Sequence, residues 1–326
     1  MTKVFLEQDI PKELTLDAAH SHSAAFICKL YDQAPLVIRP ITQHILQSPG
    51  KGVRTSLLLA SAMQENGKVP KEAIVAAAAV EIFHMATLVH DDVIDEADTR
   101  RGIASVQSKF SKKKAILCGD YLFCLSFAAI SSIYEPYTAF AEKFATSASQ
   151  ICLGEMRQYG NNYNAQLELY DYLKTIRGKT AALFHISAYG GALLGGETEK
   201  ECRLLGRFGT YLGMIFQILD DCKDYILNPE QAKKPTNSDI AAGVVNLPLL
   251  MAYFKEPSLR DMPFTVDLIR DVHRLDGVSA ALELAKKYEK KARKIVASLE
   301  NQNKSAYLEQ LMDDILRKVK EAANGK

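Results

Sequence analysis

Two segments of the chain carry paired aspartates in the pattern D-D-x-x-D, each inside an apolar stretch with helical spacing. The carboxylates are Asp91, Asp92 and Asp95 in the first segment and Asp220, Asp221 and Asp224 in the second. Residues four apart share one face of a helix, where like charges repel. A hard cation such as Mg²⁺, which takes oxygen ligands and bridges to substrate phosphates, would relieve that repulsion. Two solvated acidic turns are the alternative, which the Ile, Leu, Val and Phe around both clusters disfavour.

Cationic side chains that suit a diphosphate occur as local pairs. Arg100 and Arg101 follow the first acidic cluster, and as successive helical positions they would point about 100° apart and could serve different anions. Lys51 and Arg54 lie in P-G-K-G-V-R, just before an apolar helix whose first backbone amides also favour an anion. The sequence therefore predicts two places at which anions bind.

Three polar residues occupy apolar helical runs near these charges. Lys179, which precedes Thr180, is costly to bury unless an anion accompanies it. His84 lies seven residues before Asp91, and Gln217 lies seven before Asp224, so each faces the same way as its acidic cluster. His84 is either a core histidine or a donor to an anion. Gln217 either contributes to the site or bonds a neighbouring helix.

The overall composition excludes several other classes of protein. The chain has 326 residues, of which 48% are hydrophobic and 24% charged, so it can bury a sizeable core. A formal net charge of +1 gives no general attraction to nucleic acid or anionic membranes. Six cysteines without a C-x-x-C pair, and no apolar secretory leader, predict reduced thiols and a cytoplasmic protein. The apolar run Ala73–Val89 is interrupted by Glu81 and His84, which predicts a buried core helix instead of a transmembrane span.

The pattern of apolar residues is helical nearly throughout. A long helix is predicted over 71–98, and further helices over 112–133, 136–159, 166–194, 199–227 and 276–299. Breaks between them are short, so we predict one all-α domain over 13–326 after a loose tail at 1–12. The polar stretch 228–239, directly after the second acidic cluster, is a candidate loop over a ligand. The lysine run 112–114 reads as a solvated helix start.

The motifs around these residues resemble those of the trans-polyprenyl diphosphate synthases, also called polyprenyl synthetases. The matching segments follow that family's order along nearly the whole chain: G-K-G-V-R (50–54), H-M-A-T-L-V-H-D-D-V-I-D-E-A-D-T-R-R-G (84–102), G-D-Y-L-F (119–123), G-E-M-R-Q (154–158), R-G-K-T-A-A-L-F (177–184), F-Q-I-L-D-D-C-K-D-Y (216–225) and K-P-T-N-S-D-I-A-A-G (234–243). One D-D-x-x-D alone is weak evidence, but two with R-R-G and K-T between them are specific.

The resemblance implies an isoprenoid synthase fold, all-α, with helices around a deep central cavity. It implies a prenyltransferase that joins isopentenyl diphosphate head to tail to an allylic diphosphate, here farnesyl diphosphate. It also implies Mg²⁺ as cofactor, three ions being held with substrate bound. Family members commonly form homodimers, and some long-chain members work with a small partner subunit.

The same resemblance assigns roles to individual residues. Asp91, Asp95, Asp220 and Asp224 would hold Mg²⁺ on the allylic diphosphate, with Asp92 and Asp221 in support. Arg100, Lys179 and Lys234 would contact that diphosphate. Lys51, Arg54, His84 and Arg101 would bind isopentenyl diphosphate. Thr180 and Gln217 would present oxygen dipoles to the allylic cation.

Product length depends on what borders the growing chain. Ala86 and Thr87 lie about one helical turn before Asp91 and are small, whereas bulky aromatics there close the tunnel in short-chain members. Phe123 and Phe127 are candidate floor groups, or else ordinary core residues. By resemblance we expect a long all-trans product of roughly thirty to forty carbons, because small side chains leave the path open.

Some positions depart from the family pattern. Gly52 stands where many members have a basic residue, Thr55 where they have Pro, Val244 where Lys is common and Asn246 where Thr is frequent. The main charges remain, so an active enzyme is expected. The alternatives are a short-chain farnesyl or geranylgeranyl diphosphate synthase, a terpene cyclase, or a subunit of a heteromeric synthase. A cyclase is disfavoured by the second D-D-x-x-D and by an aromatic content of 8% without Trp.

Overall fold

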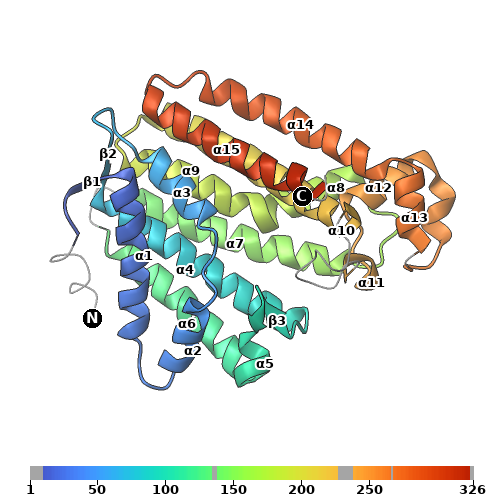
Figure 1. Cartoon of the computed structure of the whole chain (residues 1–326), viewed down its shortest axis with the longest axis horizontal. Helices are drawn as coiled ribbons and strands as arrows, with labels where there is room; N and C mark the ends of the chain where they lie inside the picture. The colour runs from blue at the N-terminus through green and yellow to red at the C-terminus, as the bar shows by residue number, and fades with distance from the viewer. Residues whose placement is uncertain (1–9, 134–137, 227–237, 266, 324–326) are drawn as a thin grey trace. The chain divides into compact units, whose positions relative to one another are not determined.

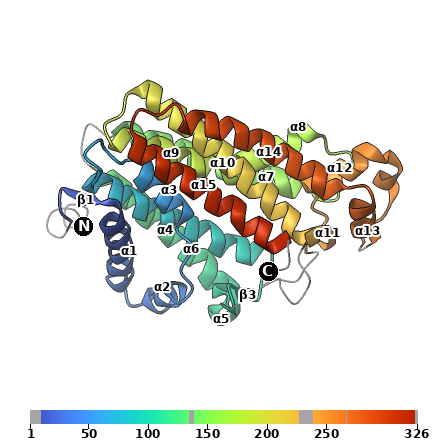
Figure 2. The same cartoon turned by 45° about the horizontal axis from the view of Figure 1, so that its top comes forward.

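The computed structural model describes residues 10–133, 138–226, 238–265 and 267–323, and these are mostly helical (Figures 1 and 2). The helices are α1 (Leu16–Asp32), α2 (Arg39–Leu46), α3 (Val53–Ser61), α4 (Lys71–Ile94), α5 (Val106–Phe110), α6 (Lys112–Ser131), α7 (Thr138–Gly160), α8 (Leu169–Ile176), the π-helix η1 (Arg177–Ala181), α9 (Ala182–Leu194), α10 (Glu199–Ile226), α11 (Ser238–Ala241), α12 (Leu247–Lys255), the 3₁₀-helix η2 (Pro257–Asp261), α13 (Asp267–Arg274), α14 (Gly277–Val296) and α15 (Gln302–Ala323). Four short strands pair antiparallel, β1 (Glu13–Thr15) with β2 (Lys68–Pro70) and β3 (Thr99–Arg100) with β4 (Ile103–Ala104).

The predicted helices are confirmed with ends that shift by a few residues, apart from two differences. The helix predicted over 71–98 ends at Ile94, and the helix predicted over 166–194 contains the π-helical turn η1. The tail 1–12 and the loop 228–239 lie mostly outside the described residues. The lysine run 112–114 is exposed at the start of α6, as expected, with the Ser111 hydroxyl accepting from the backbone N–H of Lys114.

The chain forms two compact units. Unit 1 comprises Met1–Phe144, Ser187–Leu205 and Asn301–Leu308, and unit 2 comprises Ala145–Ile186, Gly206–Glu300 and Glu309–Lys326. Each unit therefore collects segments that are distant in sequence. The single domain expected over 13–326 stays a prediction.

The core of unit 1 is built on α4, which packs against α1, α3 and most extensively α6. Its residues 73–80 expose no surface, because the helix is apolar on every side and its neighbours cover it. Alanine, the best helix former, fills the centre at 76–79 and lets neighbouring helices approach closely. The hydroxyl of Ser126 on α6 donates to the carbonyl of Ala79 at 2.8 Å. The prediction of a buried core helix over Ala73–Val89 is confirmed.

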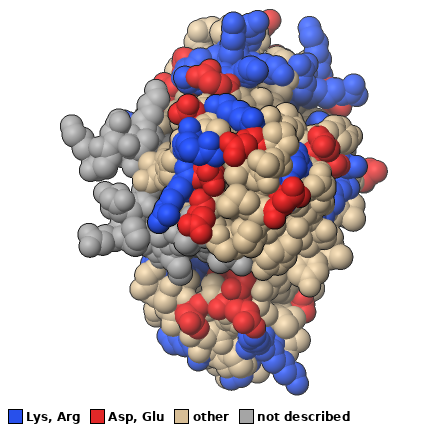
Figure 3. Space-filling view, turned by 90° about the vertical axis from the view of Figure 1, so that its right-hand side faces the viewer, with Lys and Arg blue, Asp and Glu red and all other residues tan. Residues whose placement is uncertain are grey.

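Two helices, α4 and α6, are long and apolar enough to cross a membrane by length and composition alone. The apolar window is 67% buried in α4 and 39% buried in α6. This is weak evidence for a membrane span, since core helices meet the same criteria. On the face of the molecule that Figure 3 shows, acidic and basic side chains are interspersed, in keeping with the net charge of +1.

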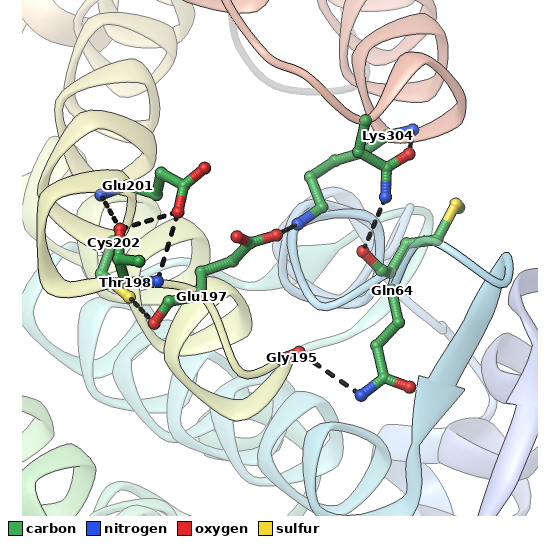
Figure 4. A network of polar contacts seen from close by, with 9 residues as sticks. Gln64, Gly195, Glu197, Thr198, Glu201, Cys202 and Lys304 are labelled. Carbon is green, nitrogen blue, oxygen red and sulfur yellow. Dashed lines mark hydrogen bonds and ion pairs between the residues drawn. The ribbon is translucent and has the colours of Figure 1, made fainter.

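A buried ion pair anchors the last segment of unit 1. Lys304 of α15 is 1% exposed and pairs with Glu197, in the turn between α9 and α10 (Figure 4). Around the pair, the side chain of Asn301 donates to the carbonyl of Met63 at 3.3 Å, and that of Gln64 to the carbonyl of Gly195 at 3.4 Å. An ammonium so well covered requires its carboxylate partner, so this pair is the anchor of the 301–308 segment.

Unit 2 is held together by close helix contacts at glycines. A Cβ on Gly213 of α10 would lie 2.6 Å from the Cα of Ala181, and one on Gly277 would lie 2.4 Å from the carbonyl oxygen of Pro248. Backbones can approach this closely only where a side chain is absent. On the surface, Arg293 of α14 pairs with Glu309 and Asp313 of α15, at 3.1 and 2.6 Å.

Removing the ammonium of Lys304 should destabilise the fold. Lys304→Ala leaves Glu197 partly buried without its partner, and we expect a loss of about 2–4 kcal/mol in the free energy of unfolding, measured by urea denaturation. Lys304→Met fills the space without a charge and should lose less. The control is Lys286→Ala, which breaks an exposed pair with Glu283 on α14 and should change nothing measurable. Equal stabilities for Lys304→Ala and wild type would contradict the anchoring role.

Candidate active site

The first acidic segment forms the end of α4 in unit 1. Asp92 is 3% exposed and accepts from Arg100, with 2.8 Å between Oδ1 and Nε. Asp91 is half-buried and Asp95, the C-cap, is exposed, so both remain reachable. The structure therefore separates Asp91 and Asp95, which could ligate a cation, from Asp92, which holds an arginine in place. The supporting role of Asp92 at the metal stays a prediction.

The helix ends before the arginines because of its capping geometry. Glu96 adopts the left-handed conformation with φ of 51°, and the N–H of Ala97 bonds back to the carbonyl of Asp92 at 2.9 Å. Together with a bond from the N–H of Glu96 to the carbonyl of Val93, this is a Schellman C-terminus. Glycine usually holds the left-handed position, so the sequence carried no signal for this end.

Arg100 and Arg101 are not on successive helical positions, and that prediction is wrong. Arg100 ends β3, while Arg101 and Gly102 form the two-residue turn that leads to β4. Both turn residues have positive φ, 50° and 84°, as in the primed turns that close tight hairpins. The two guanidinium groups therefore diverge because one belongs to a strand and the other to a turn. Arg100 binds Asp92, whereas Nη1 of Arg101 donates to the carbonyl of Ser48 at 3.1 Å.

A cluster of cationic groups forms a second feature of unit 1. Nη1 of Arg54 lies 3.0 Å from Nε2 of His84. Because a guanidinium can only donate, Nε2 accepts and the ring proton lies on Nδ1. Burial, followed by the charges of Arg54, Arg101 and Arg100, holds the pKa of His84 well below its usual value. His84 is therefore neutral and keeps one N–H with which it can donate.

Burial also affects Arg54 of this cluster. It lowers the pKa of Arg54 to about 10, against an opposing effect of Glu81. The guanidinium stays charged at neutral pH, and its desolvation favours an anionic partner. In the cluster that the sequence predicted from Lys51, Arg54, His84 and Arg101, the charges of Arg54 and Arg101 act on neutral His84. Lys51 is exposed.

Glu81 belongs to this cluster and was not predicted. Its Oε2 accepts from the hydroxyl of Thr55 at 3.2 Å. Burial lowers the pKa of both Arg54 and Arg101, and the negative charge of Glu81 opposes that lowering. A Cβ on Gly50 would lie 2.7 Å from Oε1 of Glu81 and 3.3 Å from Nη1 of Arg101. Thr55, which departs from the family pattern, therefore bonds to Glu81. In the sequence Glu81 appeared only as an interruption of an apolar run.

The residues expected to limit product length all lie in unit 1, and the two phenylalanines among them contact other rings. Ala86 is fully buried, and the hydroxyl of Thr87 donates to the carbonyl of His84 at 2.8 Å. The rings of Phe123 and Phe127 lie 4.8 and 6.2 Å from that of Phe83 on α4. Phe127 also contacts Phe144, which in turn contacts Phe83. Phe123 and Phe127 therefore pack against other rings, but Phe123 is half-buried and Phe127 is 39% exposed. Phe83, which was not predicted, is the buried ring that both of them contact.

The second acidic segment lies at the end of α10 in unit 2. Asp221 is 6% exposed and accepts from the hydroxyl of Tyr172 at 2.6 Å, from Nε2 of Gln217 at 2.8 Å and from the N–H of Leu247 at 3.4 Å. Asp220 is exposed and pairs with Lys223 at 2.9 Å. The buried carboxylate is fixed by neutral donors while the exposed one remains accessible.

Negative charge accumulates around Asp221, and the positive charge of Lys179 opposes it at Asp239. Burial, and then repulsion from Asp239, raises the pKa of Asp221 to about 7. The same two causes raise the pKa of Asp224, and burial raises that of Asp239. Asp239, whose carboxylate accepts from the amide of Asn246 at 3.2 Å, was not predicted as a site residue. Asn246, another departure from the family pattern, thus supports the acidic cluster.

The π-helix η1 carries Lys179 and Thr180. The hydroxyl of Thr180 donates to Oε1 of Gln217 at 2.6 Å, and Gln217 in turn donates to Asp221, so a relay of hydrogen bonds joins η1 to α10. Nζ of Lys179 lies 3.0 Å from Oε2 of Glu155 on α7. Glu155 is therefore the anion that accompanies Lys179, a partner that the sequence did not reveal.

Two glycines bring η1 against α7. A Cβ on Gly154 would lie 2.2 Å from the N of Lys179, and one on Gly178 would lie 2.9 Å from the carbonyl oxygen of Gln150. π-Helical turns occur frequently at functional sites, since the extra residue re-aims side chains within a continuous helix. Lys234, the remaining predicted contact of the allylic diphosphate, lies outside the described residues.

The carboxylates suit a cation that shares its ligands with a substrate. Among the described residues, no three acidic, imidazole or thiol groups converge tightly enough to hold a metal by themselves. Magnesium usually takes one or two carboxylates and completes its shell with water and phosphate oxygens. A divalent ion would neutralise the negative charge that accumulates at Asp221, Asp224 and Asp239, so the donor set fits Mg²⁺.

The raised pKa of Asp221 predicts a pH-dependent stability for the metal-free protein. The folded state binds a proton at pH values where the unfolded carboxyl has lost it, so stability falls as pH rises between about 4 and about 7 and is then constant. Relative to Asp221→Asn, the wild type should lose about 1 kcal/mol in unfolding free energy per pH unit in this window, measured by denaturation in chelator.

Tyr172→Phe tests the direction of the pKa shift of Asp221. Its hydroxyl lowers the pKa of Asp221, so removing it should extend the pH-dependent window upward. Parallel stability curves for the wild type and Asp221→Asn would contradict the buried, proton-binding carboxyl.

Comparison with known proteins identifies the family. A model described as polyprenyl synthetase matches residues 35–263. The chain is 34% identical over 259 residues to heptaprenyl diphosphate synthase component 2 of Bacillus subtilis (strain 168), covering 76% of this chain and 73% of that protein. It is 33% identical over 242 residues to the octaprenyl diphosphate synthase of Escherichia coli (strain K12), covering 74% and 73%.

Solved structures agree with this result. The heptaprenyl diphosphate synthase from Staphylococcus aureus superposes with a TM-score of 0.87 at 28% identity, over 94% of this chain and 98% of that one. A polyprenyl synthase from Caulobacter crescentus CB15, solved with calcium and isoprenyl diphosphate, gives a TM-score of 0.79 at 27% identity, over 94% and 98%. The chain belongs to the polyprenyl synthetase family and is a prenyltransferase with the all-α isoprenoid synthase fold that elongates prenyl chains.

Proposed function

We propose that this enzyme condenses isopentenyl diphosphate head to tail with an allylic diphosphate, namely farnesyl diphosphate, in a Mg²⁺-dependent reaction, and makes a long all-trans polyprenyl diphosphate. The observation that carries the proposal lies within unit 1. Reachable carboxylates at Asp91 and Asp95 suit a metal-bound diphosphate, while the desolvated guanidinium of Arg54 beside neutral His84 suits a diphosphate bound directly by the protein. Two differently bound diphosphates are what a condensation of two diphosphate substrates requires.

The residues divide into two substrate sites in this proposal. Mg²⁺, three ions with substrate bound, would be held by Asp91, Asp95, Asp220 and Asp224, and it would neutralise the charge that develops on the leaving diphosphate. Arg100, Lys179 and Lys234 contact the allylic diphosphate. Lys51, Arg54, Arg101 and the Nδ1–H of His84 bind isopentenyl diphosphate and hold its double bond toward the reacting carbon.

Other residues keep these groups in position and shield the reaction. Asp92 orients Arg100, and Asp221 holds Gln217, which accepts from Thr180. Lone pairs on the oxygens of Thr180 and Gln217 stabilise the allylic cation in this proposal. The apolar side chains around both acidic segments exclude water, which would otherwise capture the cation.

The decisive experiment uses the purified chain with labelled isopentenyl diphosphate, farnesyl diphosphate and Mg²⁺, with products resolved by chromatography. A linear long-chain product supports the proposal, and a product that stops after a single addition to farnesyl diphosphate would favour the short-chain alternative. We further propose a cytoplasmic homodimer, which sedimentation of the same preparation tests.

A heteromeric synthase is a second candidate because the Bacillus subtilis relative is named component 2. In that case this chain is the catalytic subunit and a small partner is needed for turnover. Purified chain that binds farnesyl diphosphate in a calorimeter but makes no product would favour this candidate. Turnover by the chain alone would exclude it.

Removing one carboxylate from either acidic segment should depress turnover. Asp91→Ala or Asp220→Ala takes away a group that holds charge-neutralising metal at the leaving diphosphate, and a loss of about a hundredfold to a thousandfold in kcat is expected. The matched control is Asp120→Ala, an exposed carboxylate on α6. Near-normal turnover by both folded variants would mean that these carboxylates are not metal ligands.

Adding a ring beside the growing chain should shorten the product. Ala86→Phe or Thr87→Tyr places an aromatic side chain about one turn before Asp91, so elongation should stop near fifteen to twenty carbons instead of roughly thirty to forty, because overpacking opposes further growth. Product lengths are read by chromatography. Phe127→Leu, which loosens the aromatic cluster without blocking the path, is the control and should not shorten products. Unchanged long products from both ring variants would refute the tunnel position.

A further inference from the structure

The turn that carries Arg101 is held in an unfavourable backbone conformation. Arg101 has a φ of 50°, a left-handed conformation that side chains other than glycine and asparagine rarely adopt. Such a conformation persists where the surrounding structure determines it. The question is therefore which contacts hold the β3–β4 hairpin.

One answer is a buried histidine on α2. His44 is 4% exposed, and its Nε2 lies 2.8 Å from the carbonyl oxygen of Ala104 in β4. On the other side of the ring, Nδ1 lies 3.0 Å from Nζ of Lys109 on α5. The edge of the ring also contacts Phe110, with 5.7 Å between centroids.

The two hydrogen-bond partners of His44 determine its tautomer. An ammonium has only donors, so Nδ1 of His44 accepts from Lys109 and the ring proton lies on Nε2. A carbonyl oxygen can only accept, which agrees with Nε2 as the donor to Ala104. Lys109 therefore selects the tautomer that allows His44 to bond the hairpin.

This bond acts on the hairpin at a specific place. Ala104 pairs with Thr99 across the hairpin, next to the Arg100–Ile103 pair that precedes the turn. The segment after α2 contacts the turn itself, because Ser48 provides the carbonyl that accepts from Arg101. α2 and the residues that follow it thus hold both ends of the hairpin, His44 at the strand and Ser48 at the tip.

We infer that His44 is a positioning residue for Arg101, and that Lys109 supports this role by fixing the tautomer of His44. This inference rests on the proposed role of Arg101 in binding isopentenyl diphosphate. His44 does not touch the substrate in this scheme; it sets the direction in which the guanidinium points. Its loss should therefore weaken one substrate and spare the other.

The kinetic test compares two replacements. His44→Phe keeps the ring against Phe110 but removes both nitrogens, and it should raise KM for isopentenyl diphosphate by roughly tenfold, about the factor that one buried hydrogen bond represents. KM for farnesyl diphosphate and kcat should change less than about twofold, because Arg101 is assigned to isopentenyl diphosphate alone. His44→Gln restores an N–H donor for the carbonyl of Ala104 and should recover most of the affinity. Lys109→Met should act in the same direction as His44→Phe.

Two controls set the scale of these effects. Arg101→Ala gives the largest rise in KM that the hairpin can produce. His22→Phe makes the same exchange on α1, where the ring bonds only to the carbonyl of Ala18 within its own helix among the contacts described, and it should leave both KM values unchanged. Equal changes for both substrates, or no rescue by His44→Gln, would show that His44 is merely structural and would overturn the inference.

A second measurement does not depend on turnover. Amide hydrogen exchange over 97–110 should be faster in His44→Phe than in the wild type and His44→Gln, without substrate or metal. Unchanged exchange overturns the positioning role even if the enzyme is active. If exchange changes as expected but the wild type makes no product from these substrates, the inference about the hairpin holds and the proposed function fails.

Discussion

Everything in the candidate site follows from the crowding of like charges in places where water is scarce. Asp221 and Asp224 on α10 each interact with Asp239 on α11; burial raises the pKa of all three, and repulsion from Asp239 adds to this at Asp221 and Asp224. In unit 1 the charges are positive: burial, and then the charges of Arg54, Arg101 and Arg100, lower the pKa of His84 and keep it neutral. Neither arrangement favours folding in isolation. In the proposed function, a complex of metal and diphosphate would bring opposite charge to both arrangements.

Neutral hydrogen-bonding groups make this crowding tolerable. Tyr172, Gln217 and the backbone of Leu247 all donate to Asp221, and Asn246 donates to Asp239. They stabilise the carboxylates without cancelling the charge, as an ion pair would. Exposed Asp220, by contrast, pairs with Lys223. The buried carboxylate of Asp221 is thus held in place by neutral donors, while the exposed carboxylate of Asp220 is accessible and shared with a lysine.

Much of this could be predicted from sequence, and the failures have identifiable causes. The acidic segments, long apolar helices and cationic pairs carry strong local signals in spacing and composition. The hairpin at Arg100 and Arg101 was missed because Glu96 occupies a capping position where glycine is the usual signal. Glu81, Glu155 and Asp239 were missed because a lone acid in a sequence does not reveal the cation or acid that the fold places beside it. His44 was missed for the same reason, since its partners lie 60 and 65 residues away.

The π-helix η1 limits which changes of length the run α8–η1–α9 tolerates. It amounts to one extra residue in an otherwise continuous run from Leu169 to Leu194, and each residue turns a helix by about 100°. Before the extra residue, Tyr172 is in register with Asp221; after it, Nδ1 of His185 is in register with the carbonyl of Gly206, at 2.9 Å. If one residue were deleted so that the run became an ordinary α-helix, it could keep the contact of Tyr172 with Asp221 or that of His185 with Gly206, but not both. Length in this stretch is therefore constrained more tightly than residue type, and a single deletion would be harsher than most substitutions.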